Sequence, residues 1–308
     1  MAGGFAHITA AAEAVGRLGE VEGLAPNDKM SLTQFMPFIE VGSVGPDYPY
    51  LGGQSDWADK MHYEHTGEMI RNGVRLLRDY EAGETRSRCL AWLLGYSAHV
   101  ATDLTIHPIV QARVGPYHGN ETEHRTCEMN QDTFIWPRRN LGELGLADYF
   151  QANISHCSAD DGGLHPDIVA LWQRMLELTY ADDVAGDPPE FDSWNKGFRR
   201  IVDTIDDLGS FVSFTRHLLA SKGLAYPSTE GVDLSYIDDL ETPEGPMHYD
   251  DVFDRAVDSV VGIWSQVGTA LNAPTDDESE QALAGIPNGN LDTGEYLADN
   301  ELIFWRAT

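Results

Sequence analysis

The most apolar stretch of the chain, Cys89 to Val110, constrains the fold more than any other feature. Asp103 is the only formally charged residue within it, and the stretch also contains two histidines and Pro108. It is almost long enough to cross a bilayer, but its polar residues and the proline argue against a membrane span. We therefore expect a buried core helix over 85–107.

Three polar residues of this stretch, His99, Asp103 and His107, recur every four positions. Four residues turn an α-helix by about 400°, so their side chains form one stripe, on the same side as Trp92 and Tyr96. An ionised carboxylate on this interior stripe is costly unless it is paired, and the stretch contains no lysine or arginine. Because His and Asp are natural zinc ligands, the pattern favours a metal site, with a hydrogen-bonded His–Asp pair as the alternative.

The histidines on either side of Asp103 indicate how such a site would be shared. A carboxylate with a histidine one turn away on each side can bridge two metals, each histidine serving a different one. Pro108, however, disfavours helical geometry at His107. We therefore expect the helix to end near residue 107 and His107 to point in a new direction.

Helical periodicity dominates the remaining sequence, with no convincing series of strands and no Gly-rich phosphate loop. Besides 85–107, the predicted helices cover 5–18, 30–41, 57–80, 122–136, 165–181, 193–222 and 248–272. Segments 42–56 and 112–123 are rich in Gly and Pro and are predicted to be loops. The predicted class is all-α, with one helical domain over 1–273. An acidic, irregular tail over 274–308 is expected to pack on that domain or extend from it as a surface arm.

The charge of the chain limits its partners. Fifty Asp and Glu residues against 20 Lys and Arg residues give a formal net charge of -30. This balance argues against duplex nucleic acid and anionic lipid as partners, whereas bound divalent cations would offset part of it. The three cysteines do not resemble a disulfide framework, and no secretory signal or transmembrane segment is evident. We expect a cytoplasmic location and leave the oligomeric state open.

Further candidate ligands lie outside the central stretch. They are His7 in an apolar N-terminal helix, Asp47 in the Gly/Pro loop, His62 and His65 on one helix, and the pair His124 and Glu128, four residues apart on another. Taken singly, each has an ordinary explanation, such as a satisfied core histidine or a solvated turn aspartate. Taken in order along the chain, they form a much more specific pattern.

This ordered set resembles the zinc-dependent phospholipase C family, which shares an all-helical fold and a trinuclear zinc site with the S1/P1-type nucleases. The resemblance covers roughly residues 5–135 by motif. It implies a multi-helix domain of the phospholipase C/P1 nuclease type. The implied ligands are Asp47, His62 and His99 for one zinc; His107, His124 and Glu128 for a second; and Asp103 as a bridge.

A third zinc, implied by the same resemblance, would share Asp103 and take His7. In the family this ion is completed by the amino nitrogen and carbonyl of an N-terminal tryptophan. The present chain begins Met-Ala-Gly-Gly-Phe-Ala, without a tryptophan near His7. We therefore expect two to three zinc ions, with iron as an alternative metal.

Several neighbouring residues compete for these roles. His65 lies one helical turn from His62 and could replace it as a ligand. We prefer His62 as the ligand because of its distance from Asp47 along the sequence. Asp56 and Asp59 could replace Asp47 but lack its Pro-Asp context. A further residue, Asp132, follows Glu128 by one turn, where it could orient a ligand.

The resemblance implies hydrolysis of a phosphodiester by a metal-bound water, as in phospholipase C. Asp47 would both bind zinc and accept a proton from the attacking water. The substrate class is a phosphoester, possible examples being a phospholipid or a small molecule. Tyr48 and Tyr50, which flank the Asp47 loop, and His118, expected near the mouth of the cleft, are candidate substrate contacts.

Other functions are also compatible with a helical metal site. An S1/P1-like nuclease or a small-molecule phosphoesterase would use the same ligands. A helical di-iron oxygenase would need two Glu-x-x-His units, and the relevant region contains one, Glu121-x-x-His124. A non-catalytic metal-binding protein is the remaining alternative, and metal analysis would separate zinc from iron.

Overall fold

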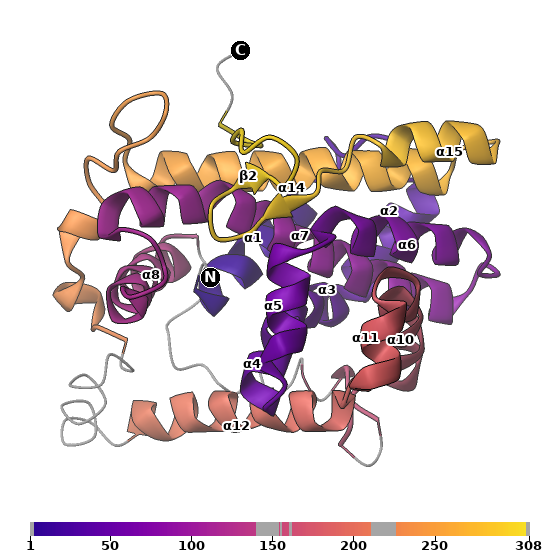
Figure 1. Ribbon diagram of the computed structural model, residues 1–308, viewed down its shortest axis with the longest axis horizontal. Coiled ribbons are helices and arrows are strands. Elements are labelled where there is room, and N and C mark those ends of the chain that lie inside the picture. The colour runs from indigo at the N-terminus through magenta and orange to yellow at the C-terminus, as the bar shows by residue number, and fades with distance from the viewer. Residues whose placement is uncertain (1–2, 140–153, 155, 160–161, 211–225, 306–308) are drawn as a thin grey trace.

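A computed structural model describes residues 3–139, 154, 156–159, 162–210 and 226–305, and the fold is all-α (Figure 1). The helices are α1 (Gly4–Gly16), α2 (Pro26–Gln34), α3 (Met36–Gly42), α4 (Tyr48–Gly52), α5 (Ser55–Tyr63), α6 (Thr66–Arg78), α7 (Glu84–Val114), α8 (Glu121–Arg138), α10 (Pro166–Thr179), α11 (Ala181–Gly186), α12 (Phe191–Ser210), α14 (Tyr249–Leu271) and α15 (Asp276–Leu283). One antiparallel hairpin pairs β1 (Gly289–Asn290) with β2 (Glu295–Tyr296). The predicted fold class is confirmed. Within the described residues, no helix is long and apolar enough to cross a membrane.

Helix α7 forms the centre of the molecule, where it packs against α3 and α14 (Figure 1). Nearly all of its residues from Cys89 to Val110 are buried, so the predicted core helix is confirmed. Glycines allow the close approach of α3: a Cβ on Gly95 would lie 2.0 Å from the carbonyl oxygen of Ile39. This contact holds the middle of α7 next to the segment that carries Asp47.

The prediction that the central helix ends near residue 107 is wrong, because α7 continues through Pro108 to Val114. A proline has no N–H, so the carbonyl of Leu104 loses its donor inside the helix. Gly294 of the C-terminal hairpin lies against this position. A Cβ on it would come 2.3 Å from Cγ of Pro108 and 2.6 Å from the Leu104 oxygen. His107 therefore stays on the helical stripe of Asp103.

Two other predicted helices are each split in the structure. The break between α2 and α3 lies at Phe35, just before Pro37. The break between α5 and α6 lies at His65, whose φ of 53° is left-handed and cannot continue a helix. The predicted loop 42–56 is largely helical, with a 3₁₀ turn at Gly45–Asp47 followed by α4. Of the predicted helix 193–222, α12 covers the part to Ser210, and 211–222 lie outside the described residues.

The C-terminal segment is more ordered than the irregular arm that we expected. Helix α15 packs on α14, and β1 contacts α5 and α6. The side-chain oxygen of Asn288 accepts hydrogen bonds from the backbone N–H groups of Gly67 and Glu68 at 2.8 and 3.0 Å. In addition, the backbone N–H of Leu291 donates to the carbonyl of His62 at 2.9 Å. The segment thus reaches the helix that carries a candidate ligand.

Candidate metal centre

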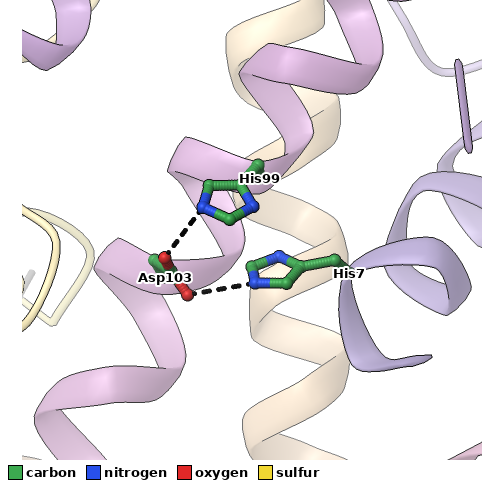
Figure 2. A group of neighbouring side chains, drawn as sticks. All are labelled: His7, His99 and Asp103. Atoms are coloured by element: carbon green, nitrogen blue, oxygen red, sulfur yellow. Dashed lines mark ion pairs between the residues drawn. The ribbon is translucent and has the colours of Figure 1, made fainter. Parts of the chain in front are cut away.

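Asp103 lies on α7, and the three imidazoles nearest to its carboxylate are those of His7, His99 and His107 (Figure 2 shows the first two). Nε2 of His99 and Nε2 of His107 each lie 3.1 Å from one of its oxygens. Nε2 of His7, which α1 brings to α7 from the far end of the sequence, lies 3.3 Å away. All four side chains are buried.

Asp47 and His62 extend this cluster on the other side of His99. The Asp47 Oδ1 atom lies 3.2 Å from His62 Nε2, which in turn lies 3.3 Å from His99 Nε2. Two groups of three residues therefore share His99, namely His7, His99 and Asp103, and Asp47, His62 and His99. Within each group the candidate donor atoms lie within 4.8 Å of one another. Such convergence of imidazoles and carboxylates is the donor set that zinc prefers.

The carboxylates of this cluster stay ionised. Burial opposes the ionisation of Asp103, but the attraction of the surrounding histidines outweighs it and holds the pKa well below the usual range. Burial also opposes ionisation of Asp47, whose pKa is nonetheless lowered by His99 and by its contact with His62. Both groups are therefore in the anionic form that binds a metal.

Backbone carbonyls orient three of the candidate imidazoles. The pairs are His62 Nδ1 with Ala58 O at 2.7 Å, His99 Nδ1 with Ser43 O at 2.9 Å, and His124 Nε2 with Gly115 O at 2.7 Å. Because a carbonyl can only accept, the bonded nitrogen must carry the hydrogen. When the ring is neutral, the other ring nitrogen keeps its lone pair, as in a metal-bound histidine.

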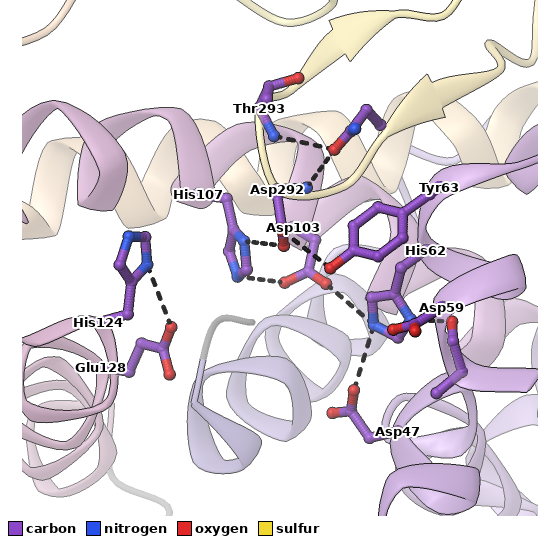
Figure 3. Close-up of polar contacts among 12 residues, drawn as sticks. Asp47, Asp59, His62, Tyr63, Asp103, His107, His124, Glu128, Asp292 and Thr293 are labelled. Carbon is purple, nitrogen blue, oxygen red and sulfur yellow. Dashed lines mark hydrogen bonds and ion pairs between the residues drawn. The ribbon is translucent and has the colours of Figure 1, made fainter. Parts of the chain in front are cut away.

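His124 and Glu128, on α8, form a separate pair in which Nδ1 and Oε1 lie 4.0 Å apart. Figure 3 shows this pair on the opposite side of His107 from Asp47. Among the described residues, it does not join His107 in a group as compact as the two above. Burial lowers the pKa of His124, which favours the neutral ring that a metal requires.

The buried donor atoms of the cluster test whether a metal fits here. Nε2 of His7, Nε2 of His107 and Oδ1 of Asp47 lie 3.1–3.3 Å from another group of the cluster, whereas Nδ1 of His7 and Nδ1 of His124 have no hydrogen-bond partner among the described residues. Each unsatisfied buried polar atom costs roughly 1–3 kcal/mol. Zinc bound by these nitrogen and oxygen donors would satisfy them together, so the donor set fits the metal.

The residues that competed with His62 and Asp47 for ligand roles do not join the buried cluster. His65 is exposed at the break before α6. Asp56 and Asp59 are exposed too, and Asp59 accepts a hydrogen bond from Tyr50 at 2.8 Å. The structure thus places His62, and not His65, next to Asp47.

Asp132 contacts the start of α1 and not a candidate ligand. Its carboxylate accepts hydrogen bonds from the backbone N–H of Ala6 at 2.7 Å and of Phe5 at 3.3 Å, and from the hydroxyl of Tyr226 at 3.1 Å. A carboxylate at this position satisfies free N–H groups of the first helical turn. Asp132 therefore holds the helix that carries His7.

The three candidate substrate contacts lie in different environments. Tyr48 belongs to the hydrophobic core, where it stacks on Phe198 and has no surface free for a substrate. Tyr50 is partly buried, with its ring centre 5.5 Å from that of His62, so it does lie beside the cluster. His118 is fully exposed, and no ion pair or hydrogen bond in the described part of the chain joins it to the cluster.

The structure adds one acidic residue that the sequence reasoning missed, Asp292, in the turn between β1 and β2 (Figure 3). Its Oδ1 lies 3.6 Å from Nδ1 of His107, and its Oδ2 accepts a hydrogen bond from the Tyr63 hydroxyl at 2.9 Å. Burial opposes its ionisation, but His107 and Tyr63 help to lower its pKa to about 2. The signal in the sequence was the turn context of "GNLDTG", similar to that which singled out Asp47.

A buried cluster of imidazoles and carboxylates on packed helices is a candidate metal centre of a helical protein. The model of the family described as zinc dependent phospholipase C matches residues 6–181, more than half of the chain, and the chain belongs to this family. Neither a curated protein nor a solved structure gives a significant match. The matched range contains every ligand expected from the sequence, whereas Asp292 lies outside it. Family and site together support a zinc-dependent hydrolase.

Proposed function

We propose that this protein is a multinuclear zinc phosphodiesterase that cleaves a phosphoester in the manner of a phospholipase C. The observation that carries the proposal is the pair of ligand groups that share His99 and include Asp103. Two groups so close together suit ions that act on one substrate. Membership of the phospholipase C family supports a phosphoester or lipid as the substrate class.

In this proposal the cluster holds two to three ions. The proposed ligands are His7, Asp47, His62, His99, Asp103, His107, His124 and Glu128. When bound, zinc supplies Lewis acidity that neutralises the phosphate and makes water more acidic. The buried Asp103 has no exposed surface, so its proposed role is to hold metal and not to contact substrate.

Asp47 is the proposed general base. Its side chain is 16% exposed, so water can reach it, whereas Asp103 beside it is fully buried. Its lowered pKa keeps the carboxylate ionised, as a proton acceptor must be. Tyr50, next to His62, is the proposed lining of the substrate site.

We expect Asp47→Asn to reduce hydrolysis by roughly 100- to 10,000-fold, the range typical of a lost general base. The matched control is Asp56→Asn, which removes an exposed carboxylate from the neighbouring helix and should leave the rate unchanged. Rates are measured at equal zinc content, determined by metal analysis. An Asp47→Asn protein with full zinc content and full rate would exclude Asp47 as the base.

The substrate is tested with the metal-loaded protein on phosphatidylcholine, single-stranded DNA and small soluble phosphodiesters. We expect a phosphodiester other than DNA to be preferred, because the net charge of -30 repels polyanions. Preference for DNA would indicate a nuclease instead. Bound iron with an absorption band would favour the di-iron alternative, and zinc binding without hydrolysis of any substrate would favour a non-catalytic protein.

A further inference from the structure

The imidazole of His107 differs from three other candidate ligands in what faces its second nitrogen. His62, His99 and His124 each use one ring nitrogen for a backbone carbonyl. Neither nitrogen of His107 bonds to a backbone carbonyl among the described residues. Its Nε2 faces Asp103 at 3.1 Å, and its Nδ1 faces Asp292 at 3.6 Å. A carboxylate thus stands where the other rings have a carbonyl.

Contacts of Asp292 and of its neighbour Leu291 hold the Asp292 carboxylate in this place. The Tyr63 hydroxyl donates to its Oδ2 at 2.9 Å, and its own backbone N–H donates to the side-chain oxygen of Asn290 at 2.9 Å. The preceding residue, Leu291, is buried and donates to the carbonyl of His62. The turn is therefore attached to the helix of one candidate ligand while its carboxylate faces another.

The close packing of Gly294 against α7 determines the position of the turn along this helix. Its φ of 68° is left-handed, and a side chain there would overlap Pro108. Pro108 directly follows His107, so the same contact that places the turn also fixes its distance from the imidazole. This arrangement is specific to one position on the helix and does not arise from a general acidic surface.

We infer that Asp292 is a positioning residue, which accepts the Nδ1 hydrogen of His107 so that Nε2 is directed to the metal site beside Asp103. A carboxylate in this position fixes the ring orientation and makes the metal-binding nitrogen more basic. The inference rests on the proposed function, because it requires that His107 bind a metal. It assigns a role in the metal centre to the C-terminal hairpin, outside the residues that match the family.

The test is zinc affinity, measured on the full-length metal-free protein by competition with a chromophoric chelator. We expect Asp292→Asn to weaken zinc binding at the His107 site by about 10- to 100-fold, the usual effect of losing an orienting partner. Asp292→Ala should weaken it at least as much. The matched control is Asp299→Asn, which removes an exposed carboxylate from the same segment and should leave the affinity unchanged.

A second measurement separates positioning from general stability. In the Co²⁺-substituted protein, Asp292→Asn should change the visible absorption bands, which report on ligand geometry, whereas Asp299→Asn should not. The isosteric Asn variant is decisive if the Ala variant does not fold, and circular dichroism of the metal-free proteins checks this. If Asp292→Asn has the same zinc affinity and the same Co²⁺ spectrum as the unmodified protein, the inference is wrong but the proposed function stands. Failure of the unmodified protein to bind zinc would overturn the proposed function as well.

Discussion

At the scale of single residues, the direction of each imidazole nitrogen decides what a histidine can do. His62 and His65 are separated by three positions, and sequence spacing alone hardly distinguishes them. In the structure, His62 is buried with Nδ1 bonded to Ala58 and Nε2 facing Asp47. His65 sits at the helix break, exposed, with its ring against Tyr180. Burial and a bonded second nitrogen separate a candidate ligand from a surface residue.

This contrast gives a paired prediction. We expect His62→Asn to weaken zinc binding by more than the 10- to 100-fold typical of orienting partners, because it removes a donor itself. His65→Asn should bind zinc normally, and Asn tolerates the left-handed backbone of that position. Chelator competition on both purified variants measures the difference. Equal zinc affinity in the two variants would contradict the placement of His62 in the metal centre.

At the scale of elements, α1 depends on α8 for the position of His7. Asp132 on α8 bonds the first backbone N–H groups of α1, and a Cβ on Gly3 would overlap the Asp132 carboxylate. Burial raises the pKa of Asp132 to about 7, although the hydrogen bonds from Ala6, Phe5 and Tyr226 act in the opposite direction. The carboxylate therefore ionises in the folded protein only near neutral pH, at a cost to stability.

The sign of this effect can be tested. The folded-state pKa of Asp132 is raised, so its contribution to stability is complete below about pH 4 and is lost as the pH rises through 7. Between pH 5 and 8 the free energy of unfolding should fall in the unmodified protein relative to Asp132→Asn, by on the order of a few kcal/mol. Denaturant unfolding of the metal-free proteins measures both curves. Parallel curves would show that Asp132 does not titrate in this range.

At the scale of the whole molecule, the C-terminal segment joins helices that are distant in sequence. Trp305 is buried, and its indole N–H donates to the carbonyl of Thr105 on α7 at 2.7 Å. Leu291 is also buried, and Asn288 bonds the start of α6. The segment therefore contributes to the core as well as presenting Asp292 to the metal centre.

Truncation after Ala273 tests the predicted boundary between 1–273 and 274–308. Each large buried side chain removed contributes roughly 1.5–3 kcal/mol, and whole domains are stable by only about 5–15 kcal/mol. We therefore expect the truncated chain to lose its cooperative thermal unfolding transition. Trp305→Phe, which keeps an aromatic ring but loses the hydrogen bond and part of the buried surface, should cost only about 1–3 kcal/mol. A truncated protein with normal cooperative unfolding would favour an independent domain over 1–273.

The candidate centre was largely predictable wherever ligands follow helical spacing. His99, Asp103 and His107 share a stripe because a four-residue interval returns nearly to the same side of a helix. The continuation of the helix through Pro108 was not predictable in this way. A proline disfavours the helix locally, but the packing of Gly294 and the buried surroundings of α7 outweigh this preference. Tyr48 likewise follows Asp47 directly in the sequence and was expected to contact substrate, but its side chain is buried in the hydrophobic core.

By itself, the sequence determined the all-α class, the buried central helix and the chemical nature of the site, because these depend on local periodicity and on the cost of burying charge. Only the tertiary structure decided which residues from distant segments meet there. The approach of His7 depends on α8, and that of Asp292 depends on a hairpin seated against α7. Such long-range contacts arise from the packing of whole elements, which no local spacing encodes.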